Sequence, residues 1–183
     1  MRHIPNIICL LRIVLIIPVL QALQAGHYLL SLALCILAAA SDLLDGYLAK
    51  HFGWSSALGR FLDPLADKLL VVALYIASAW LGIVPWWLTA AVVARDVMIG
   101  LGALTYRLWF GPLHGRPTRI SKFNTGAQLV FIMLVLLGHG IGFPPQEVLA
   151  ASAIVVLVST ILSGWDYLST FTRRAWYAPA KAA

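Results

Sequence analysis

The chain has 183 residues, of which 61% are hydrophobic and only 11% are charged, and its mean hydropathy is +0.89. This composition excludes a soluble globular protein and predicts an integral membrane protein with a single domain over residues 1–183. The net charge is +6, but the basic residues do not cluster with interleaved aromatic residues. The charge therefore indicates anionic membrane lipid as a partner and not nucleic acid.

Six apolar segments have about the 20 residues that a helix needs to cross a bilayer. They cover residues 4–24, 28–50, 58–81, 85–109, 121–141 and 147–170. Glycine or proline falls in every connection between them. The first segment has the apolar character of a signal peptide, but Arg12 and Pro18 interrupt it, so we expect a helix of the mature protein. The sequence predicts an all-α polytopic membrane protein with six transmembrane helices.

The distribution of Lys and Arg predicts the orientation of these helices. The connections after the first, third and fifth segments carry no Lys or Arg, whereas both tails and the membrane ends around the second and fourth connections do; Lys50 and Arg60 flank the second, and Arg107, Arg116 and Arg119 lie at the fourth. Because positive residues are retained on the cytoplasmic side, we expect both termini and the polar cleft described next to face the cytoplasm. The expected location is a bacterial-type inner or plasma membrane.

Four of the seven acidic residues lie between positions 42 and 67. Asp42 and Asp45 are one helical turn apart, as are Asp63 and Asp67, so each pair shares a helix face. Ionisable residues at membrane depth are costly and indicate function, and four converging acids would repel one another without a cation. Oxygen ligands without a Cys/His cluster favour Mg²⁺ or Mn²⁺ over zinc. We therefore predict a site for two divalent ions.

Small residues continue both acidic stripes. Gly46 and Ala49 follow Asp42 and Asp45 on one helix face and leave a hollow in which a ligand can approach the backbone. Gly59 precedes Asp63 at four-residue spacing and begins a matching stripe on the next helix. The two stripes together predict one metal and nucleotide cleft. Pro64 is expected either to kink the third helix or to mark where its regular part starts.

Basic residues before and within the fifth segment provide a candidate anion site. Arg116, Arg119 and Lys122 recur at three-residue intervals, and several donors at a helix start suit a phosphate. The alternative is that they are ordinary cytoplasmic-side positive residues.

Two further features are polar residues inside apolar segments. Arg95 and Asp96 would point about 100° apart on a helix and meet different partners, with Asp166 a candidate for Arg95. Structural pairing and a substrate role both stay open.

Cys9 and Cys35 form no CxxC and are expected in the core. The five histidines form no metal-binding pair, and we assign them no catalytic role.

The spacing D-x2-D-G-x2-A-x9-G-x3-D-x3-D resembles the motif of the CDP-alcohol phosphatidyltransferase family. The resemblance implies transfer of a phosphatidyl group from CDP-diacylglycerol to an alcohol with release of CMP. It implies two Mg²⁺ or Mn²⁺ ions, with Asp67 as a metal ligand and the catalytic base. The remaining implied ligands are Asp42, Asp45 and Asp63 for metal and Asn6, Gly46, Ala49, Lys50 and Gly59 for the CDP group. Lys50 replaces the Arg of the family motif and keeps its positive charge.

The segments DPLADK, ARDVM and ISKFNT resemble those of phosphatidylglycerophosphate synthases and of CDP-dependent cardiolipin synthases, with a lean toward the latter. The implied acceptor is glycerol-3-phosphate or phosphatidylglycerol, both of which carry a glycerol hydroxyl and a phosphate, and members of the family are often homodimers. The alternative function is a divalent-cation or proton transporter that uses the same acids. It would need a polar path to the far side, where the connections offer only His27, His139 and Glu147.

Overall fold

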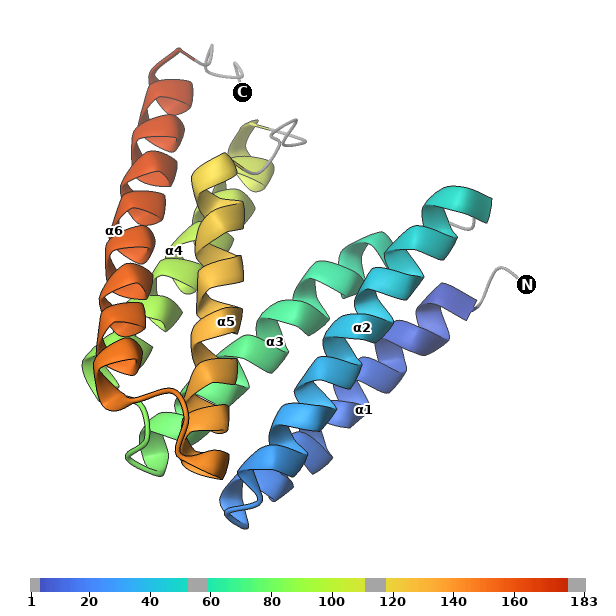
Figure 1. Ribbon diagram of the computed structural model, residues 1–183. Helices are drawn as coiled ribbons and strands as arrows, with labels where there is room; N and C mark the ends of the chain where they lie inside the picture. Colours follow the sequence, from blue (N-terminus) through green and yellow to red (C-terminus); the bar gives the residue numbers. More distant parts are fainter. Residues whose placement is uncertain (1–3, 53–58, 111–117, 178–183) are drawn as a thin grey trace. The chain divides into compact units, whose positions relative to one another are not determined.

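The computed structural model describes residues 4–52, 59–110 and 118–177, with side chains described for residues 11, 13–41, 68–102, 104–105 and 118–170. The described residues form six α-helices and contain no strand (Figure 1). The helices are α1 (Ile4–Gln24), α2 (Tyr28–Phe52), α3 (Gly59–Trp80), α4 (Trp86–Phe110), α5 (Arg119–Ile141) and α6 (Gln146–Tyr177).

These bounds confirm the predicted helical segments. Helix α6 is the longest and continues to Tyr177, beyond the predicted end at residue 170, because a helix already formed extends readily into polar sequence. Among the described residues, α5 and the Gln146–Thr170 part of α6 are long and apolar enough to cross a membrane by length and composition. Shorter apolar stretches occur in α1, α2 and α3.

The chain divides into two compact units, of which unit 1 comprises residues 1–84 and 132–146. In unit 1, α1 packs against both α2 and α3 (Figure 1). The fully buried side chains here are mostly apolar, including Leu23, Cys35, Leu74 and Tyr75. Burial of Cys35 confirms its predicted place in the core; the side chain of Cys9 lies outside those described.

Glycines end two of the helices in unit 1. Gly26 follows α1 at φ 76°, and its N–H donates to the Leu23 carbonyl oxygen at 3.1 Å while the next N–H, of His27, donates to Ala22 at 2.9 Å. Gly82 ends α3 with the same pair of bonds. In this left-handed termination, two N–H groups donate to carbonyl groups that would otherwise have no hydrogen-bond donor at the helix end. Glycine adopts the conformation without steric strain. The predicted turns at both glycines are therefore confirmed.

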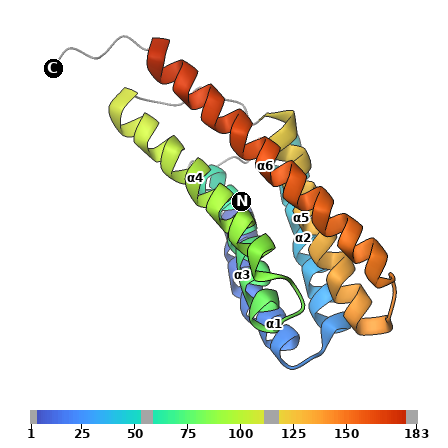
Figure 2. The same cartoon turned by 90° about the vertical axis from the view of Figure 1, so that its left-hand side faces the viewer.

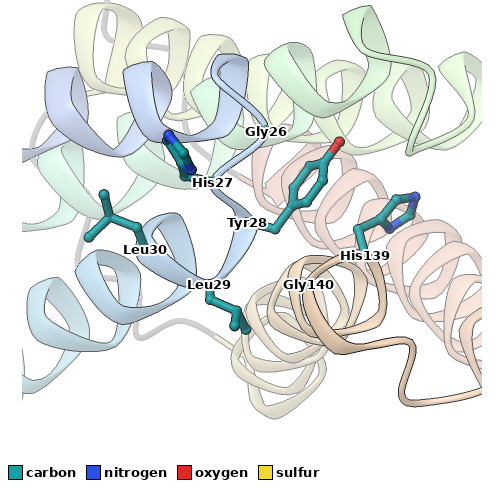
Figure 3. A pocket seen from close by; sticks show the side chains of 7 residues that line it. All are labelled: Gly26, His27, Tyr28, Leu29, Leu30, His139 and Gly140. Atoms are coloured by element: carbon teal, nitrogen blue, oxygen red, sulfur yellow. The ribbon is translucent and has the colours of Figure 1, made fainter.

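A shallow pocket of about 480 Å³ lies in unit 1 where α2 begins and α5 ends (Figure 3). The rings of Tyr28 and His139 lie 5.4 Å apart, and the His139 Nδ1 atom is 2.9 Å from the Val135 carbonyl oxygen. Leu29 extends toward Gly140 so closely that a Cβ atom at Gly140 would lie 2.7 Å from the Leu29 Cδ2 atom. Close packing and one aromatic contact are therefore the features that hold these residues together.

Unit 2 comprises residues 85–131 and 147–183 and contains α4, the first part of α5, and α6. Helices α5 and α6 are joined by a short connection and run antiparallel (Figures 1 and 2). Among the described side chains, unit 2 buries more polar residues than unit 1 does. Its buried polar residues are Thr89, Arg95, Ser121, Asn124, Gln128, Ser159, Thr160 and Ser163. Sequence reasoning had singled out only Arg95 among them.

Candidate functional site

The four acidic residues of the motif lie on regular helix. The backbone of α2 is helical through Asp42 and Asp45, and that of α3 is helical through Asp63 and Asp67. Residues three and four apart share a helix face, so the backbone places Asp42 and Asp45 on one face of α2 and Asp63 and Asp67 on one face of α3, as expected. Their side chains lie outside those described, so their metal-binding roles stay predictions.

Helices α2 and α3 bring these stripes to one end of unit 1. Phe52 ends α2 and Gly59 begins α3, and the seven residue steps between them span about 25 Å at most. Figure 1 shows the end of α2, the start of α3 and the start of α1 at the same end of the unit. The backbone positions of Gly46, Ala49 and Lys50 on α2 and of Asn6 on α1 are therefore at this end too.

The structure decides between the two predicted roles of Pro64. Helix α3 begins at Gly59, five residues earlier in the chain, so the alternative in which regular helix starts at Pro64 is wrong. Pro64 is the sixth residue of α3, beyond the four N–H groups that have no partner at a helix start, so it removes one hydrogen bond of the helix, and the kink expected there stays a prediction. Gly59 is the first residue of α3, which agrees with its expected place at the head of the second stripe.

Divalent ions are chemically suited to the predicted donors. The four carboxylates offer only oxygen atoms, which hard cations prefer. Among the described side chains, no three His, Cys, Asp or Glu residues are grouped so as to hold a metal. The helical backbone through all four aspartates is compatible with an oxygen-ligated pair of ions, and the ions stay a prediction.

Two of the three predicted phosphate-binding cations are described. Thr118 caps α5, with its hydroxyl oxygen accepting from the Ser121 N–H at 3.3 Å, as a threonine at an N-cap does. Arg119 and Lys122 follow in the first turn of α5, and both side chains are exposed. Both are therefore accessible to an anion. Arg116 lies outside the described residues.

Arg95 lies at the centre of a buried network in unit 2, with 5% of the residue exposed. Its Nη1 atom donates to the Asp96 carboxylate at 2.5 Å, and its Nη2 atom donates to the hydroxyl oxygens of Ser121 at 2.7 Å and Ser163 at 2.5 Å. Its guanidinium also lies 5.9 Å from the centre of the Tyr167 ring, within cation–π range. The network joins α4, α5 and α6.

These contacts correct two expectations. Arg95 and Asp96 were expected to have different partners, yet they pair, because a long arginine side chain reaches back to its neighbour although the two Cβ atoms diverge. Asp166 was a candidate partner of Arg95, but it is not among the partners of Arg95, and its Oδ2 atom is buried without a partner among the described residues. Structural pairing of Arg95 is confirmed, and a substrate role stays a hypothesis.

A second polar cluster in unit 2 surrounds Asn124. Its Oδ1 atom accepts from the hydroxyls of Ser159 at 2.8 Å and Thr160 at 3.0 Å. The Asn124 Nδ2 atom and the Arg95 Nε atom are buried with no partner among the described residues. The sequence signal for both clusters was the polar runs SKFN and STILS within apolar helices, since buried polar groups in membrane proteins find partners on other helices.

Comparisons with known proteins identify the family. The chain is 36% identical over 149 residues to the probable cardiolipin synthase (CMP-forming) of Drosophila melanogaster, covering 73% of this chain and 46% of that protein. It is 33% identical over 181 residues to the cardiolipin synthase (CMP-forming) of Rattus norvegicus, covering 90% and 60%. It is 31% identical over 182 residues to the probable phosphatidylglycerophosphate synthase of Mycobacterium tuberculosis, covering 93% and 82%.

The chain thus spans about half of the length of the two cardiolipin synthases that it matches and most of the length of the bacterial protein. The profile of one family matches residues 2–165, which include the whole motif and all of α1 to α5. The family agrees with the resemblance inferred from the seven motif residues. On these grounds the chain belongs to the CDP-alcohol phosphatidyltransferase family.

Proposed function

We propose that the chain transfers a phosphatidyl group from CDP-diacylglycerol to a glycerol-containing acceptor and releases CMP, as a step of phospholipid biosynthesis. The observation that carries the proposal is the placement of all seven motif residues on the helical backbone of α2 and α3, at one end of unit 1. The names of the relatives, two of them CMP-forming cardiolipin synthases, support the same reaction class.

Each motif residue has a role that its chemistry supports. Asp42, Asp45, Asp63 and Asp67 would hold two Mg²⁺ or Mn²⁺ ions, which when bound neutralise the negative charge of the diphosphate and of the leaving CMP. Asp67 accepts the proton of the acceptor hydroxyl, since a carboxylate among other acids has its proton affinity raised. The hydroxyl oxygen forms the new bond to the phosphatidyl phosphorus, and the anhydride bond to CMP breaks.

The remaining motif residues bind the donor. Gly46, Ala49 and Gly59 have little or no side chain, so the cytidine diphosphate group can approach the helix backbone. Lys50 supplies a positive charge for a phosphate, and Asn6 at the start of α1 supplies a polar contact. Arg119 and Lys122, with Arg116, bind the phosphate of the acceptor through charge-assisted hydrogen bonds.

The proposal includes a membrane arrangement. All six helices cross the membrane within a single domain, with both termini and the motif on the cytoplasmic side of a bacterial-type inner or plasma membrane. Three observations support this arrangement. The helix bounds agree with the predicted spans, and two helices are long and apolar enough to cross a membrane. The Lys and Arg residues lie in the tails and around every second connection, on the side expected to be cytoplasmic. A homodimer, expected from the family resemblance, stays a prediction.

The experiment is CMP release by the purified chain in detergent, with CDP-diacylglycerol, Mg²⁺ or Mn²⁺, and glycerol-3-phosphate or phosphatidylglycerol as acceptor. The proposal expects metal-dependent release with one of them, and Asp67→Asn is expected to abolish it while the melting temperature stays near that of the parent. A control is Thr105→Ala, which removes an exposed hydroxyl with its hydrogen bond to the Leu101 carbonyl oxygen and one methyl group. Absence of release from the folded parent with every acceptor would contradict the proposal, and normal turnover by Asp67→Asn would remove Asp67 from the reaction.

A further inference from the structure

Two buried polar atoms of unit 2, one a donor and one an acceptor, have no hydrogen-bond partner among the described residues. The donor is the Nε atom of Arg95, and the acceptor is the Oδ2 atom of Asp166. Buried polar groups nearly always have a partner, because a group that gives up water and gains nothing in return is costly. The cost is high for Asp166, since it lies in the part of α6 that is long and apolar enough to cross a membrane. One ligand that satisfies both atoms would remove both costs.

The contacts of Arg95 bring the two atoms to the same turn of α6. The Arg95 Nη2 atom is 2.5 Å from the Ser163 hydroxyl oxygen, and a Cβ atom added at Gly164 would lie 3.9 Å from the Arg95 Cγ atom. The guanidinium carbon is 5.9 Å from the centre of the Tyr167 ring. Asp166 follows Ser163 by three residues, a spacing at which Cβ atoms on a helix are about 5–6 Å apart. The carboxylate is therefore within reach of a ligand on Nε, since two hydrogen bonds in series span about 5 Å.

The other donors of Arg95 fix the orientation of its guanidinium. The Nη1 atom donates to the Asp96 carboxylate on α4, and the Nη2 atom donates to Ser121 on α5 and to Ser163 on α6. The five N–H donors of arginine form one rigid planar fork, so they turn together. Turning the fork until Nε meets Asp166 directly would break bonds to three helices. A ligand that comes to Nε satisfies the pair without that loss.

The charges at the two atoms select the ligand. The Asp166 carboxylate would repel an anion, and the Arg95 guanidinium would repel a cation. Water is neutral, accepts from the Nε–H group and donates to the Oδ2 atom, and buried waters usually bind polar groups that have no other partner. We propose that one buried water molecule bridges Arg95 Nε and Asp166 Oδ2. Asp166 is then a second, water-mediated carboxylate partner of Arg95, and the network holds one carboxylate from α4 and one from α6.

The sign of a change in melting temperature tests whether Asp166 has a partner. With the water in place, Asp166→Leu removes the acceptor and leaves the Arg95 Nε–H group buried and unsatisfied, so we expect a fall of about 2–6 °C. Asp166→Asn keeps an oxygen that accepts from the water and should lower the melting temperature less. Without a partner, the buried carboxylate would be a net cost, and Asp166→Leu would raise the melting temperature. The control is Glu147→Leu, which removes an exposed acid from the first turn of the same helix and should have a smaller effect.

Radiolytic labelling of the unmodified chain tests the water itself. X-rays split water into hydroxyl radicals, and a water held inside a protein oxidises the side chains beside it. We expect oxidation of Tyr167, next to Asp166 on α6, and none of Tyr75, which is fully buried in unit 1. After rapid mixing with heavy-oxygen water, the label on Tyr167 should change isotope more slowly than that on Tyr28, which lines an open pocket. Asp166→Leu should reduce the oxidation of Tyr167 several-fold and leave that of Tyr28 unchanged.

Three results would each overturn the proposed water. A higher melting temperature for Asp166→Leu would show that the carboxylate has no partner to lose. Oxidation of Tyr167 that exchanges isotope as fast as that of Tyr28, or that survives Asp166→Leu unchanged, would identify bulk water as its source. A lower melting temperature without oxidation of Tyr167 would identify a direct contact between Arg95 and Asp166. Neither measurement uses CMP release, so the outcome is independent of the proposed function.

Discussion

Replacing Asp96 with Asn tests whether the Arg95 network stabilises the fold or binds a substrate. The side chains of Arg95 and Asp96 are 4% and 10% exposed, so the substitution leaves a buried guanidinium without its nearest opposite charge. Removing one partner of a buried ion pair costs about 3–5 kcal/mol. Because Ser121, Ser163 and the Tyr167 ring still contact the guanidinium, we expect the lower end, about 3 kcal/mol.

The assay is thermal unfolding of the purified chain in detergent, with Thr105→Ala as the control for loss of an exposed hydrogen bond. For a protein of this size, 1 kcal/mol shifts the melting temperature by about 2–4 °C, so Asp96→Asn should lower it by about 6–12 °C. The double variant Arg95→Met with Asp96→Leu should recover part of that loss, since it removes both charges of the pair. A fall smaller than that of Thr105→Ala, together with a raised KM for the acceptor, would refute the stabilising role and favour substrate binding.

Three other predictions concern packing, the Asn124 cluster and the metal. Gly140→Ala should destabilise unit 1 because its Cβ would lie 2.7 Å from Leu29, whereas Gly100→Ala, with open space around it, should be neutral or stabilise by up to about 1 kcal/mol; melting temperatures of both variants check this. Asn124→Leu should cost about 1–3 kcal/mol in the same assay because the Thr160 hydroxyl loses its acceptor inside the bundle, and an unchanged melting temperature would contradict the hydrogen bonding described. EDTA should abolish CMP release, and added Mg²⁺ or Mn²⁺ should restore it; full activity after metal removal would exclude a metal-dependent reaction.

The helices could be predicted from sequence because each depends on local information. Apolar length set the segments, and turn residues such as Gly26 and Gly82 set where α1 and α3 end. The carboxylate stripes were predictable for the same reason, since spacing along one helix is a property of the chain itself. The role of Pro64 was left open because proline is compatible both with the first turn of a helix and with a kink inside one, and the sequence alone does not say which applies.

Contacts between helices could not be predicted in the same way. Arg95 meets Ser121 and Ser163, which are 26 and 68 residues away, and only packing in three dimensions selects these serines from the others in the chain. The pairing of Arg95 with Asp96 was missed because helical geometry describes where Cβ atoms point and not where a long flexible side chain ends. The apolar hollow lined by Phe123, Val155 and Val158 likewise depends on how α5 and α6 face each other.

The position of Asp96 next to Arg95 has a consequence for the synthesis of the protein. Helix α4 is synthesised before α5 and α6, so in the proposed six-span arrangement α4 would reach the membrane before the serine partners of Arg95 are made. A lone arginine at the centre of an inserting helix costs about 2.5–3.5 kcal/mol. An aspartate adjacent in the chain is present as soon as the arginine is, so in the proposed arrangement α4 would carry its own neutralising charge into the bilayer. The later helices would then add the serine hydroxyls to a network whose first contact lies within α4.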